Sequence, residues 1–476
     1  MDARPDQGAS TRDQGGSGVS RRRREHARRP AGSNVNRPLV AIVGRPNVGK
    51  STLFNRLAGQ HVAIVEDIPG VTRDRHYADA HALGREFVLI DTGGFDPDSD
   101  DPMKAGITSQ VRLALDECDV VICVVDATVD PLPADREAVA LLRDAGKPVI
   151  FVGNKADSKP KEHDVVTYYE LGISSIMPIS ALHGRGIGDL EEAIANHLPE
   201  VVEIEGPDLN VPRVAIVGRP NAAKSSLVNQ LCGEERQLVD SRPGTTVDSV
   251  DTLIERDGTS LILIDTAGIR RKRSVKKRGI EGLGVLQAIR SIERSHVVVL
   301  MIDAEAGVGE QDAKIVGLAD DRGRALVIAL NKADLLTREA QKEAMDRTRE
   351  VLAFVPWAPM VTVSALQGRG VTALLGRVED AVVEHRKRIG TAELNRFFEE
   401  VLEKHPPPTM HHRSIRLYYI TQATIGPPTF VIMTNDPKGV HFSYQRYVVN
   451  QIRERFGFRG TPIRVRYRGK KKRDPK

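Results

Sequence analysis

The sequence of 476 residues contains only three cysteines and no long apolar segment. Cys118, Cys123 and Cys232 offer neither a paired disulfide framework nor the spacing of a metal site, so we expect a reducing compartment, with Cys118 and Cys123 packed in a core. The lack of any run of about 18 apolar residues argues against a membrane span. Hydrophobic residues still make up 40% of the chain, which is enough for ordinary cores. The length predicts about three domains.

Residues 1–37 lack apolar periodicity and the apolar stretch of a secretory signal. They are rich in Gly, Ser, Arg, Asp and Gln, and this composition predicts a disordered, basic N-terminal extension. A transit peptide is the alternative, but the four acidic residues of the segment count against it. We therefore expect a cytoplasmic protein with no membrane partner and leave the role of the extension open.

Positive charge is concentrated at the two ends of the chain. Residues 1–37 hold nine Lys or Arg against four Asp or Glu, and residues 391–476 hold 17 against seven. Because the formal net charge of the whole chain is only +5, residues 38–390 are acidic. An acidic body with basic ends favours a polyanionic partner, most often nucleic acid. Solvated charged tails are the alternative.

The central part of the chain repeats internally. The segment Gly44–Ser51 recurs 174 residues later, the Asp-Thr-x-Gly motif at Asp91 recurs after 174 residues, and the Asn-Lys-Ala-Asp motif at Asn154 after 177. Three motifs in the same order indicate a duplicated domain. Short apolar runs between them predict parallel strands in sheets covered on both faces. The runs are 39–43, 87–90, 120–125 and 149–152 in the first copy, and 214–217, 261–264, 297–302 and 325–330 in the second.

The repeated segment is a phosphate-binding loop. Its first copy fits the pattern G-x-x-x-x-G-K-[ST], whereas the second has Ala223 in place of the last glycine. Backbone N–H groups at the start of the following helix favour a phosphate. Lys50 and Lys224 would contact the β- and γ-phosphate oxygens, and the next residues, Ser51 and Ser225, would hold Mg²⁺. The other expected contacts are Gly44, Arg45, Pro46, Asn47, Val48 and Gly49, and Gly218, Arg219, Pro220, Asn221, Ala222 and Ala223.

Two later motifs in each copy predict a guanine nucleotide. Asp91 and Asp265 end apolar strands, where a carboxylate can hold a water of the Mg²⁺ shell, and the motif's last glycine can sense a γ-phosphate. Asp157 and Asp334 can accept from both N1–H and the 2-amino group of guanine, whereas adenine offers neither donor in that arrangement. The expected contacts are Asp91, Thr92, Gly93, Gly94, Phe95, Asn154, Lys155, Ala156, Asp157, Ser180 and Ala181, and Asp265, Thr266, Ala267, Gly268, Ile269, Asn331, Lys332, Ala333, Asp334, Ser364 and Ala365.

The C-terminal segment follows a different pattern. Helices are expected at 393–404 and 444–456, and strands at 414–420, 429–433 and 463–467, which together make a small α+β domain. Tyr418 and Tyr419 could stack on bases, although strand aromatics are more often core residues. The stretch 457–460 matches G-x-x-G but precedes the last strand, so we expect a turn. Contact with RNA phosphates and contact with the preceding domains remain alternatives for this segment.

Together these motifs closely resemble the Der/EngA family of tandem-domain GTPases, which are ribosome assembly factors. Residues 69–74 (PGVTRD) and 243–248 (PGTTVD) look like the family's switch I segments, and the stretch 405–458 is similar to its third domain. The resemblance covers about 38–468 and implies an α/β fold. Two P-loop GTPase domains with doubly wound, mostly parallel sheets would precede a small α+β KH-like domain. The expected boundaries are 1–37 for the extension, 38–200 and 213–388 for the GTPase domains, 201–212 for a linker, 389–468 for the KH-like domain and 469–476 for a basic tail.

The resemblance also implies a function. GTP would be hydrolysed to GDP with Mg²⁺, and the nucleotide state would control association with rRNA and the large (50S) ribosomal subunit during its assembly. We expect a monomer with no DNA partner. Thr72 and Thr246 would close on Mg²⁺ and the γ-phosphate, and the residues expected to carry catalysis are Lys50, Thr72, Gly94, Lys224, Thr246 and Gly268. The alternative is a guanine-nucleotide-gated RNA scaffold with incidental hydrolysis and an impaired second site.

The glutamine that orients the attacking water in Ras-like enzymes is missing. Phe95 and Ile269 occupy its position and cannot hydrogen-bond a water, so intrinsic hydrolysis should be slow. In related GTPases an Asn of the phosphate loop helps to bind K⁺, and Asn47 and Asn221 match it. K⁺ stimulation is therefore expected, and a purely loop-shaping role of these residues is the alternative.

Two further differences make the copies unequal. If position 223 needs a positive φ, alanine costs about 1–2 kcal/mol there, although a small shift of the loop is an alternative. After the Asp-x-x-Gly motif, residues 95–101 of the first copy include four acids, whereas 270–278 of the second include seven basic residues. This basic stretch predicts a phosphate-binding surface that moves with nucleotide state, the alternative being a mobile solvated loop.

Overall fold

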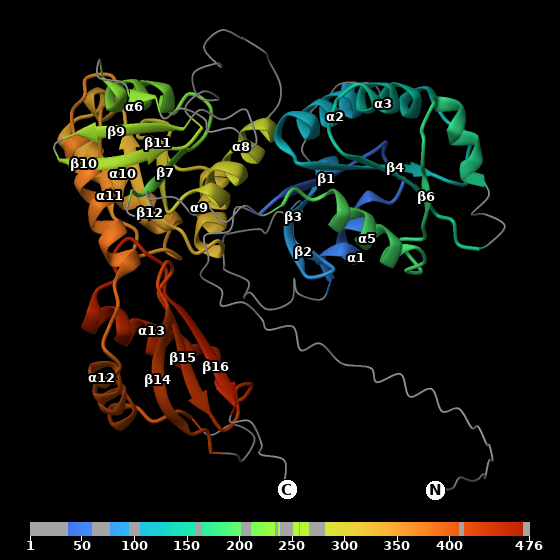
Figure 1. Cartoon of the computed structure of the whole chain (residues 1–476). Coiled ribbons are helices and arrows are strands. Elements are labelled where there is room, and N and C mark those ends of the chain that lie inside the picture. Colours follow the sequence, from blue (N-terminus) through green and yellow to red (C-terminus); the bar gives the residue numbers. More distant parts are fainter. Residues whose placement is uncertain are drawn as a thin grey trace, which may run out of the picture. The chain divides into compact units, whose positions relative to one another are not determined.

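The computed structural model describes residues 37–59, 77–94, 105–158, 164–200, 211–233, 237–238, 251–256, 258–265, 281–408 and 414–469. Within these residues the strands form three sheets, of six, seven and three strands. We call the parts built on them the first, second and third domains (Figure 1). No helix in the described part is long and apolar enough to cross a membrane.

The first sheet has the strand order β2-β3-β1-β4-β5-β6, and all neighbours are parallel except β2 and β3. The expected strands are present, but β2 and β6 are additional: β2 is polar at alternate positions, and β6 has two residues. The strands are β1 (Leu39–Val43), β2 (Tyr77–Ala82), β3 (Arg85–Asp91), β4 (Val120–Asp126), β5 (Val149–Asn154) and β6 (Met177–Pro178).

Helices cover both faces of this sheet (Figure 1). Leu39 and Ala41 of β1 share a core with the face bearing α2 and α3, whereas Val40 and Ile42 pack with α1 and α5. This alternation explains why β1 and β4 are continuous apolar runs, since both of their faces are buried. The helical segments are α1 (Lys50–Ala58), η2 (Thr92–Gly94), α2 (Ala105–Glu117), α3 (Pro133–Arg143), η3 (Asp164–Leu171) and α5 (Ile187–His197).

The second sheet repeats the arrangement of the first. Its order is β13-β12-β11-β7-β10-β9-β8. In the reverse direction, β9-β10-β7-β11-β12-β13 corresponds to β2-β3-β1-β4-β5-β6 of the first sheet, and β8 is an additional edge strand. The edge strand β8 pairs antiparallel with β9, and β9 pairs antiparallel with β10, whereas the other neighbours are parallel. The strands are β7 (Arg213–Val217), β8 (Gln237–Leu238), β9 (Thr252–Arg256), β10 (Thr259–Leu263), β11 (Val297–Asp303), β12 (Ala325–Asn331) and β13 (Met360–Thr362). The helical segments are α6 (Lys224–Cys232), α8 (Glu281–Arg294), α9 (Glu310–Asp321), η4 (Ala333–Leu335), α10 (Arg338–Val351) and α11 (Val371–Arg386).

The third domain has two helices on one face of a three-stranded sheet (Figure 1). Its elements are α12 (Thr391–Lys404), β14 (Leu417–Thr424), β15 (Thr429–Thr434), α13 (Phe442–Phe456) and β16 (Arg464–Gly469). The small α+β domain was therefore correctly expected, but its first strand begins later than 414. All three cysteines are buried and free, as the core interpretation of Cys118 and Cys123 requires.

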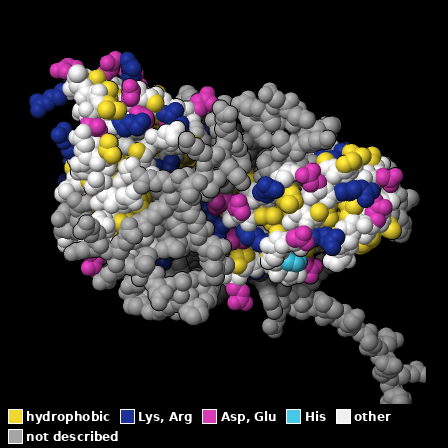
Figure 2. Space-filling view, turned by 90° about the horizontal axis from the view of Figure 1, so that it is seen from above, with side chains coloured by type: hydrophobic (Ala, Val, Ile, Leu, Met, Phe, Trp, Pro, Cys, Tyr) yellow, Lys and Arg dark blue, Asp and Glu magenta, His cyan; other side chains and the backbone are white. Residues whose placement is uncertain are grey.

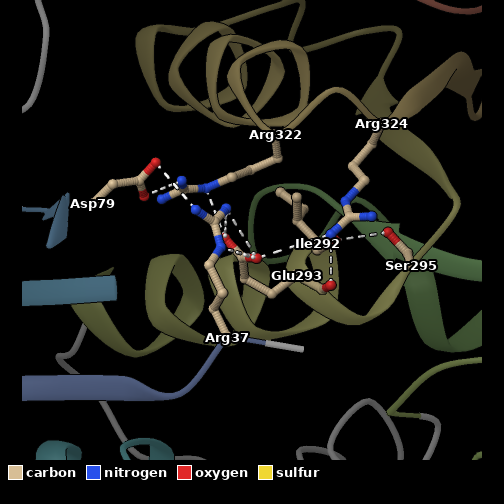
Figure 3. A network of polar contacts seen from close by, with 7 residues as sticks. All are labelled: Arg37, Asp79, Ile292, Glu293, Ser295, Arg322 and Arg324. Carbon is tan, nitrogen blue, oxygen red and sulfur yellow. Dashed lines mark hydrogen bonds and ion pairs between the residues drawn. The ribbon is translucent and has the colours of Figure 1, made fainter. Parts of the chain in front are cut away.

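Five charged side chains join the first and second domains (Figure 3). Glu293, near the end of α8, has a side chain only 1% exposed. Arg37 lies 3.2 Å from it, Arg322 lies 2.7 Å from it, and Arg324 donates to its backbone carbonyl at 2.7 Å. Asp79 on β2 pairs with Arg37 at 3.1 Å and also with Arg322. Although burial opposes them, Arg322 and Arg37 hold the pKa of Asp79 below its ordinary value.

Glu293→Gln should therefore destabilise the chain. The change keeps the shape of the side chain but leaves three arginines around a neutral amide, and breaking a buried charge pair costs about 3 kcal/mol or more. We expect a clear fall in the midpoint of the first unfolding transition in calorimetry. The matched control is Glu343→Gln, which removes an exposed pair with Arg347 and should change stability by less than about 0.5 kcal/mol. Equal midpoints for the two variants would contradict the structural role of Glu293.

Candidate nucleotide sites

The first phosphate loop connects β1 to α1 and is already folded around its lysine. The Nζ of Lys50 donates to the carbonyl oxygens of Gly44 and Arg45 at 2.8 and 2.9 Å. Burial lowers the pKa of Lys50 below the ordinary lysine value. A Cβ on Gly44, whose φ is +149°, would lie 2.3 Å from the carbonyl oxygen of Val124. The position therefore requires glycine, and Lys50 is held beside the loop that it would serve.

The Asp-Thr-x-Gly motif meets this loop at the end of β3. Ser51 Oγ donates to Asp91 Oδ2 at 2.9 Å, and Gly93 N donates to Asp91 Oδ1 at 2.9 Å. Thr92 Oγ1 donates to the carbonyl oxygen of Ile42 at 2.8 Å, which ties the motif to β1. A hydroxyl and a carboxylate oxygen thus meet at the start of α1. Oxygen donors of this kind are the ligands that Mg²⁺ prefers, so the residues present fit that ion.

The Asn-Lys-Ala-Asp motif connects the phosphate loop with the loop that contains Ser180 and Ala181. Asn154 donates through Nδ2 to the carbonyl oxygen of Val48 at 2.8 Å and accepts at Oδ1 from Ala181 N at 2.9 Å. Ser180 Oγ donates to Asp157 Oδ1 at 2.7 Å. Three segments that are distant in sequence therefore meet around Asn154. This bridging role was not predicted, since Asn154 was expected only among the base contacts.

The second domain builds the same arrangement. Lys224 Nζ donates to the carbonyl oxygens of Gly218 and Arg219 at 2.6 and 2.7 Å. Asn331 donates to the carbonyl oxygen of Ala222 at 3.0 Å and accepts from Ala365 N at 2.8 Å. The Asp-Thr-x-Gly segment differs, because Asp265 has φ 56° and its N–H donates to Asp251 Oδ1 at 3.3 Å. Gln367 Nε2 donates to Asp334 Oδ2 at 3.4 Å, and Ser364 Oγ accepts from Gln367 N.

Ala223 adopts the left-handed conformation, with φ 61° and ψ 35°, where Gly49 has φ 93° and ψ 26°. The condition for a backbone penalty at this position is therefore met. A Cβ on Gly49 would lie 2.3 Å from Asn154 Nδ2, so the first loop has no room for alanine in its own geometry. The second loop accommodates the methyl group with a smaller φ, and the bond from Asn331 to the loop is slightly longer than its counterpart from Asn154. Position 223 thus has the positive φ on which the expected penalty depends, and the effect on GTP affinity stays a prediction.

Ala223→Gly should tighten GTP binding to the second domain by up to about tenfold. Glycine would let the loop reach the geometry of the first domain without a clash against Asn331. Titration with a fluorescent GTP analogue, with the first site disabled in both proteins, measures the change. The control is Gly376→Ala on α11, where a Cβ would meet nothing within 4 Å. This added methyl group should leave the GTP affinity of the second domain unchanged. Equal affinities of wild type and Ala223→Gly would show that the alanine is harmless.

Carboxylates that were not predicted contact the phosphate loop and the Asn-Lys-Ala-Asp motif in both domains. Asp126, the last residue of β4, pairs with Lys155 of the Asn-Lys-Ala-Asp motif at 2.7 Å. Burial opposes ionisation, but hydrogen bonds from Lys155 and Thr128 lower the pKa of Asp126. Asp135 on α3 pairs with the loop arginine Arg45 at 3.3 Å, and burial raises the pKa of Asp135. The second domain repeats both pairs as Asp303 with Lys332 and Asp312 with Arg219. Each Asp ends a strand or lies in the first turn of a helix. Aspartate is common at both positions in any protein, so the sequence offered no reason to single these residues out.

Several expected site residues lie outside the described residues. They are Thr72, Phe95, Thr246, Thr266, Ala267, Gly268 and Ile269, together with the acidic stretch 96–101 and the basic stretch 270–278. Gly94 is described only as the last residue of η2. All residues of the two phosphate loops are described, and each loop connects a strand to a helix. Asn47 and Asn221 are exposed and have left-handed backbones, with φ 65° and 67°.

Two phosphate loops of this geometry, each combined with an Asn-Lys-Ala-Asp motif on a mostly parallel sheet, define a protein with two P-loop GTPase domains. The family model described as 50S ribosome-binding GTPase matches residues 39–155 and 213–332. A model of the KH-domain-like C-terminal part of EngA GTPases matches 388–468, and one of the elongation factor Tu GTP-binding domain matches 285–384.

Curated relatives align over almost the whole chain. GTPase Der of Syntrophotalea carbinolica is 44% identical over 92% of this chain and 100% of its own length. GTPase Der of Geobacter metallireducens is 45% identical over the same shares, and that of Moorella thermoacetica is 47% identical over 91% of this chain and 98% of its own. The chain therefore belongs to the GTPase Der family. Family membership makes it a GTP-binding GTPase that uses GTP or GDP and Mg²⁺.

Proposed function

We propose that this GTPase acts in the assembly of the large (50S) ribosomal subunit and that its nucleotide state controls its association with rRNA. The observation that carries the proposal is the duplication of the phosphate loop, in which Lys50 and Lys224 are each held by two loop carbonyls. The description of the family model, 50S ribosome-binding GTPase, supports the choice of partner. We further propose a cytoplasmic monomer with the domain boundaries 38–200, 213–388 and 389–468.

Each site would bind its nucleotide through three parts of the domain. Lys50 and Lys224 leave the loop carbonyls and contact the β- and γ-phosphate oxygens, while Asp157 and Asp334 accept from guanine. The Mg²⁺ ligands would be Ser51, Thr72, Asp91, Ser225, Thr246 and Asp265. When bound, this ion neutralises charge on the phosphate oxygens. Asn154 and Asn331 keep the phosphate loop and the base loop in register, so binding at one end orders the other.

Slow intrinsic hydrolysis with K⁺ stimulation forms part of the proposal. No glutamine follows either Asp-x-x-Gly motif, so catalysis would depend on added positive charge beside the phosphates. The proposed K⁺ contacts are Asn47 and Asn221, which are exposed and have left-handed backbones. A turnover rate that is the same in KCl and NaCl would contradict this part of the proposal.

The second candidate function is a nucleotide-gated RNA scaffold in which hydrolysis by the second domain is incidental. The left-handed conformation of Ala223 favours this alternative, since the strained loop belongs to the domain with the basic stretch after its Asp-x-x-Gly motif. Comparison of the two loop lysines separates the two functions, as described in the Discussion.

Co-sedimentation with ribosomal particles tests the proposed function. We expect the full chain to pellet with the 50S subunit in a non-hydrolysable GTP analogue and to be released in GDP. The 30S subunit is the control particle, and the double variant Lys50→Ala/Lys224→Ala is the control protein. Equal pelleting in both nucleotides, or a preference for the 30S subunit, would contradict the proposal.

A further inference from the structure

The third domain has one sheet face that its own helices do not cover. Phe430 and Ile432 of β15 lie in the core with α12 and α13. Val431 and Met433, which alternate with them, are only partly buried and do not belong to that core. Because successive strand residues point to opposite faces, Val431 and Met433 mark the face away from the helices.

Strand pairing shows which residues of β14 and β16 lie on the same face as Val431 and Met433. Met433 pairs with Tyr419 on β14 and with Arg468 on β16. Val431 pairs with Thr421 and with Arg466. The two rows are separated by one intervening pair, or about 7 Å along the strands. We call these six residues the open face: Tyr419, Thr421, Val431, Met433, Arg466 and Arg468.

The open face combines an exposed aromatic side chain with unneutralised positive charge. Tyr419 is 45% exposed, and Arg466 and Arg468 are exposed. Strands β14, β15 and β16 contain no Asp or Glu. Within the described part of the chain neither arginine forms an ion pair, whereas their neighbour on the same strand, Arg464, pairs with Asp320 of the second domain. By contrast, acidic and basic side chains are interspersed on the surface seen from above (Figure 2).

The glycine stretch of this domain is engaged elsewhere. Gly460 N donates to the carbonyl oxygen of Trp357, and the Gly460 carbonyl accepts from Leu326 N. Phe458 is fully buried, and a Cβ on Gly460 would lie 2.8 Å from Ala381 Cβ. The stretch 457–460 is thus part of the contact with the second domain. The open face, by contrast, leaves Tyr419, Arg466 and Arg468 exposed.

We propose that the open face binds single-stranded RNA, with Tyr419 stacking on a base and with Arg466 and Arg468 contacting phosphates. Aromatic side chains on an open sheet stack on unpaired bases, which duplex RNA does not expose. Charge complementarity favours a polyanion, because the three strands carry no acidic residue. The inference deepens the proposed function and rests on it, since it places the rRNA contact on particular residues.

Binding of a fluorescein-labelled single-stranded RNA of about 12 nucleotides to the full chain, followed by anisotropy, tests the proposal. Tyr419→Ala should weaken binding about tenfold, while Tyr419→Phe should bind like wild type, because stacking needs the ring and not the hydroxyl. The double variant R466A/R468A should lower the slope of log affinity against log salt by about 1.4, from about 0.7 per lost phosphate contact.

Matched controls come from the other domains. Tyr169→Ala removes a tyrosine of similar exposure, 44%, from the first domain. R347A/R349A removes two exposed arginines with the same spacing from α10. Neither control should change RNA affinity or salt slope. The proposal is overturned if Tyr419→Ala binds RNA as wild type does, if R347A/R349A lowers the salt slope as much as R466A/R468A, or if an RNA duplex competes as well as the single strand.

The outcome is separable from that of the proposed function. If Tyr419→Ala and R466A/R468A bind RNA normally while GTP-dependent pelleting with the 50S subunit persists, the open face contacts another partner and only the present inference fails. Suppose instead that pelleting of the wild-type protein does not depend on nucleotide, while the protein still binds single-stranded RNA through Tyr419. That result would refute the proposed function alone. All variants should retain wild-type GTP turnover without RNA.

Discussion

Asp157→Asn is expected to weaken GTP binding to the first domain by about 1,000-fold. The carboxylate would accept two charge-assisted hydrogen bonds from guanine, each contributing about 1.5–3 kcal/mol, and an amide can accept only one and presents N–H₂ to the other donor. Xanthine carries a carbonyl where guanine has its amino group. The variant should therefore gain affinity for xanthosine triphosphate, because Asn can donate to that carbonyl.

Fluorescent-nucleotide titration measures both effects. Asp334→Asn is the counterpart in the second domain, and the double variant should bind no guanine nucleotide at micromolar concentrations. Asp144→Asn changes an exposed carboxylate of the first domain outside the site and should leave both affinities unchanged. Wild-type GTP affinity in the Asp157→Asn/Asp334→Asn protein would refute the assignment of guanine recognition to these residues. Loss of binding to all nucleotides, together with a lower melting temperature, would point to Ser180 losing its partner.

Lys50→Ala is expected to reduce GTP turnover by the first domain by about 100- to 1,000-fold. Removal of a single preorganised donor from a developing charge has an effect of this size. The loop holds Nζ at 2.8 and 2.9 Å from the carbonyl oxygens of Gly44 and Arg45, so the ammonium group lies beside the loop before nucleotide binds. Turnover by single-site variants in KCl and NaCl measures the contribution of each domain.

Lys224→Ala is the informative comparison. If the second domain hydrolyses GTP, this variant lowers K⁺-stimulated turnover as Lys50→Ala does. If turnover is unchanged but GTP-dependent pelleting with the 50S subunit is lost, the second domain gates binding without contributing hydrolysis. Lys342→Ala, an exposed lysine on α10, is the control and should behave like wild type. Full turnover in the Lys50→Ala/Lys224→Ala protein would contradict the role of both lysines.

Most central strands and the loop motifs could be predicted, because their signals are local. A strand buried on both faces, such as β4, is a continuous apolar run, and the phosphate loop depends on consecutive residues. Edge strands were missed: β2 alternates polar residues with alanine, and β6 and β8 have two residues each. The carboxylates Asp126 and Asp135 were also missed, since their partners lie on other elements.

The sequence by itself determined the chemistry of each loop. Three repeated motifs in one order define two guanine-nucleotide sites, because a loop's hydrogen-bonding groups follow from a few adjacent residues. Only the tertiary structure decided how these loops are joined, that Ala223 is left-handed, and that Tyr419 and Arg468 lie on one face of a sheet. These features depend on contacts between residues far apart in the chain. Such contacts arise from packing and strand register. A local sequence pattern describes only one of the two residues that form each contact.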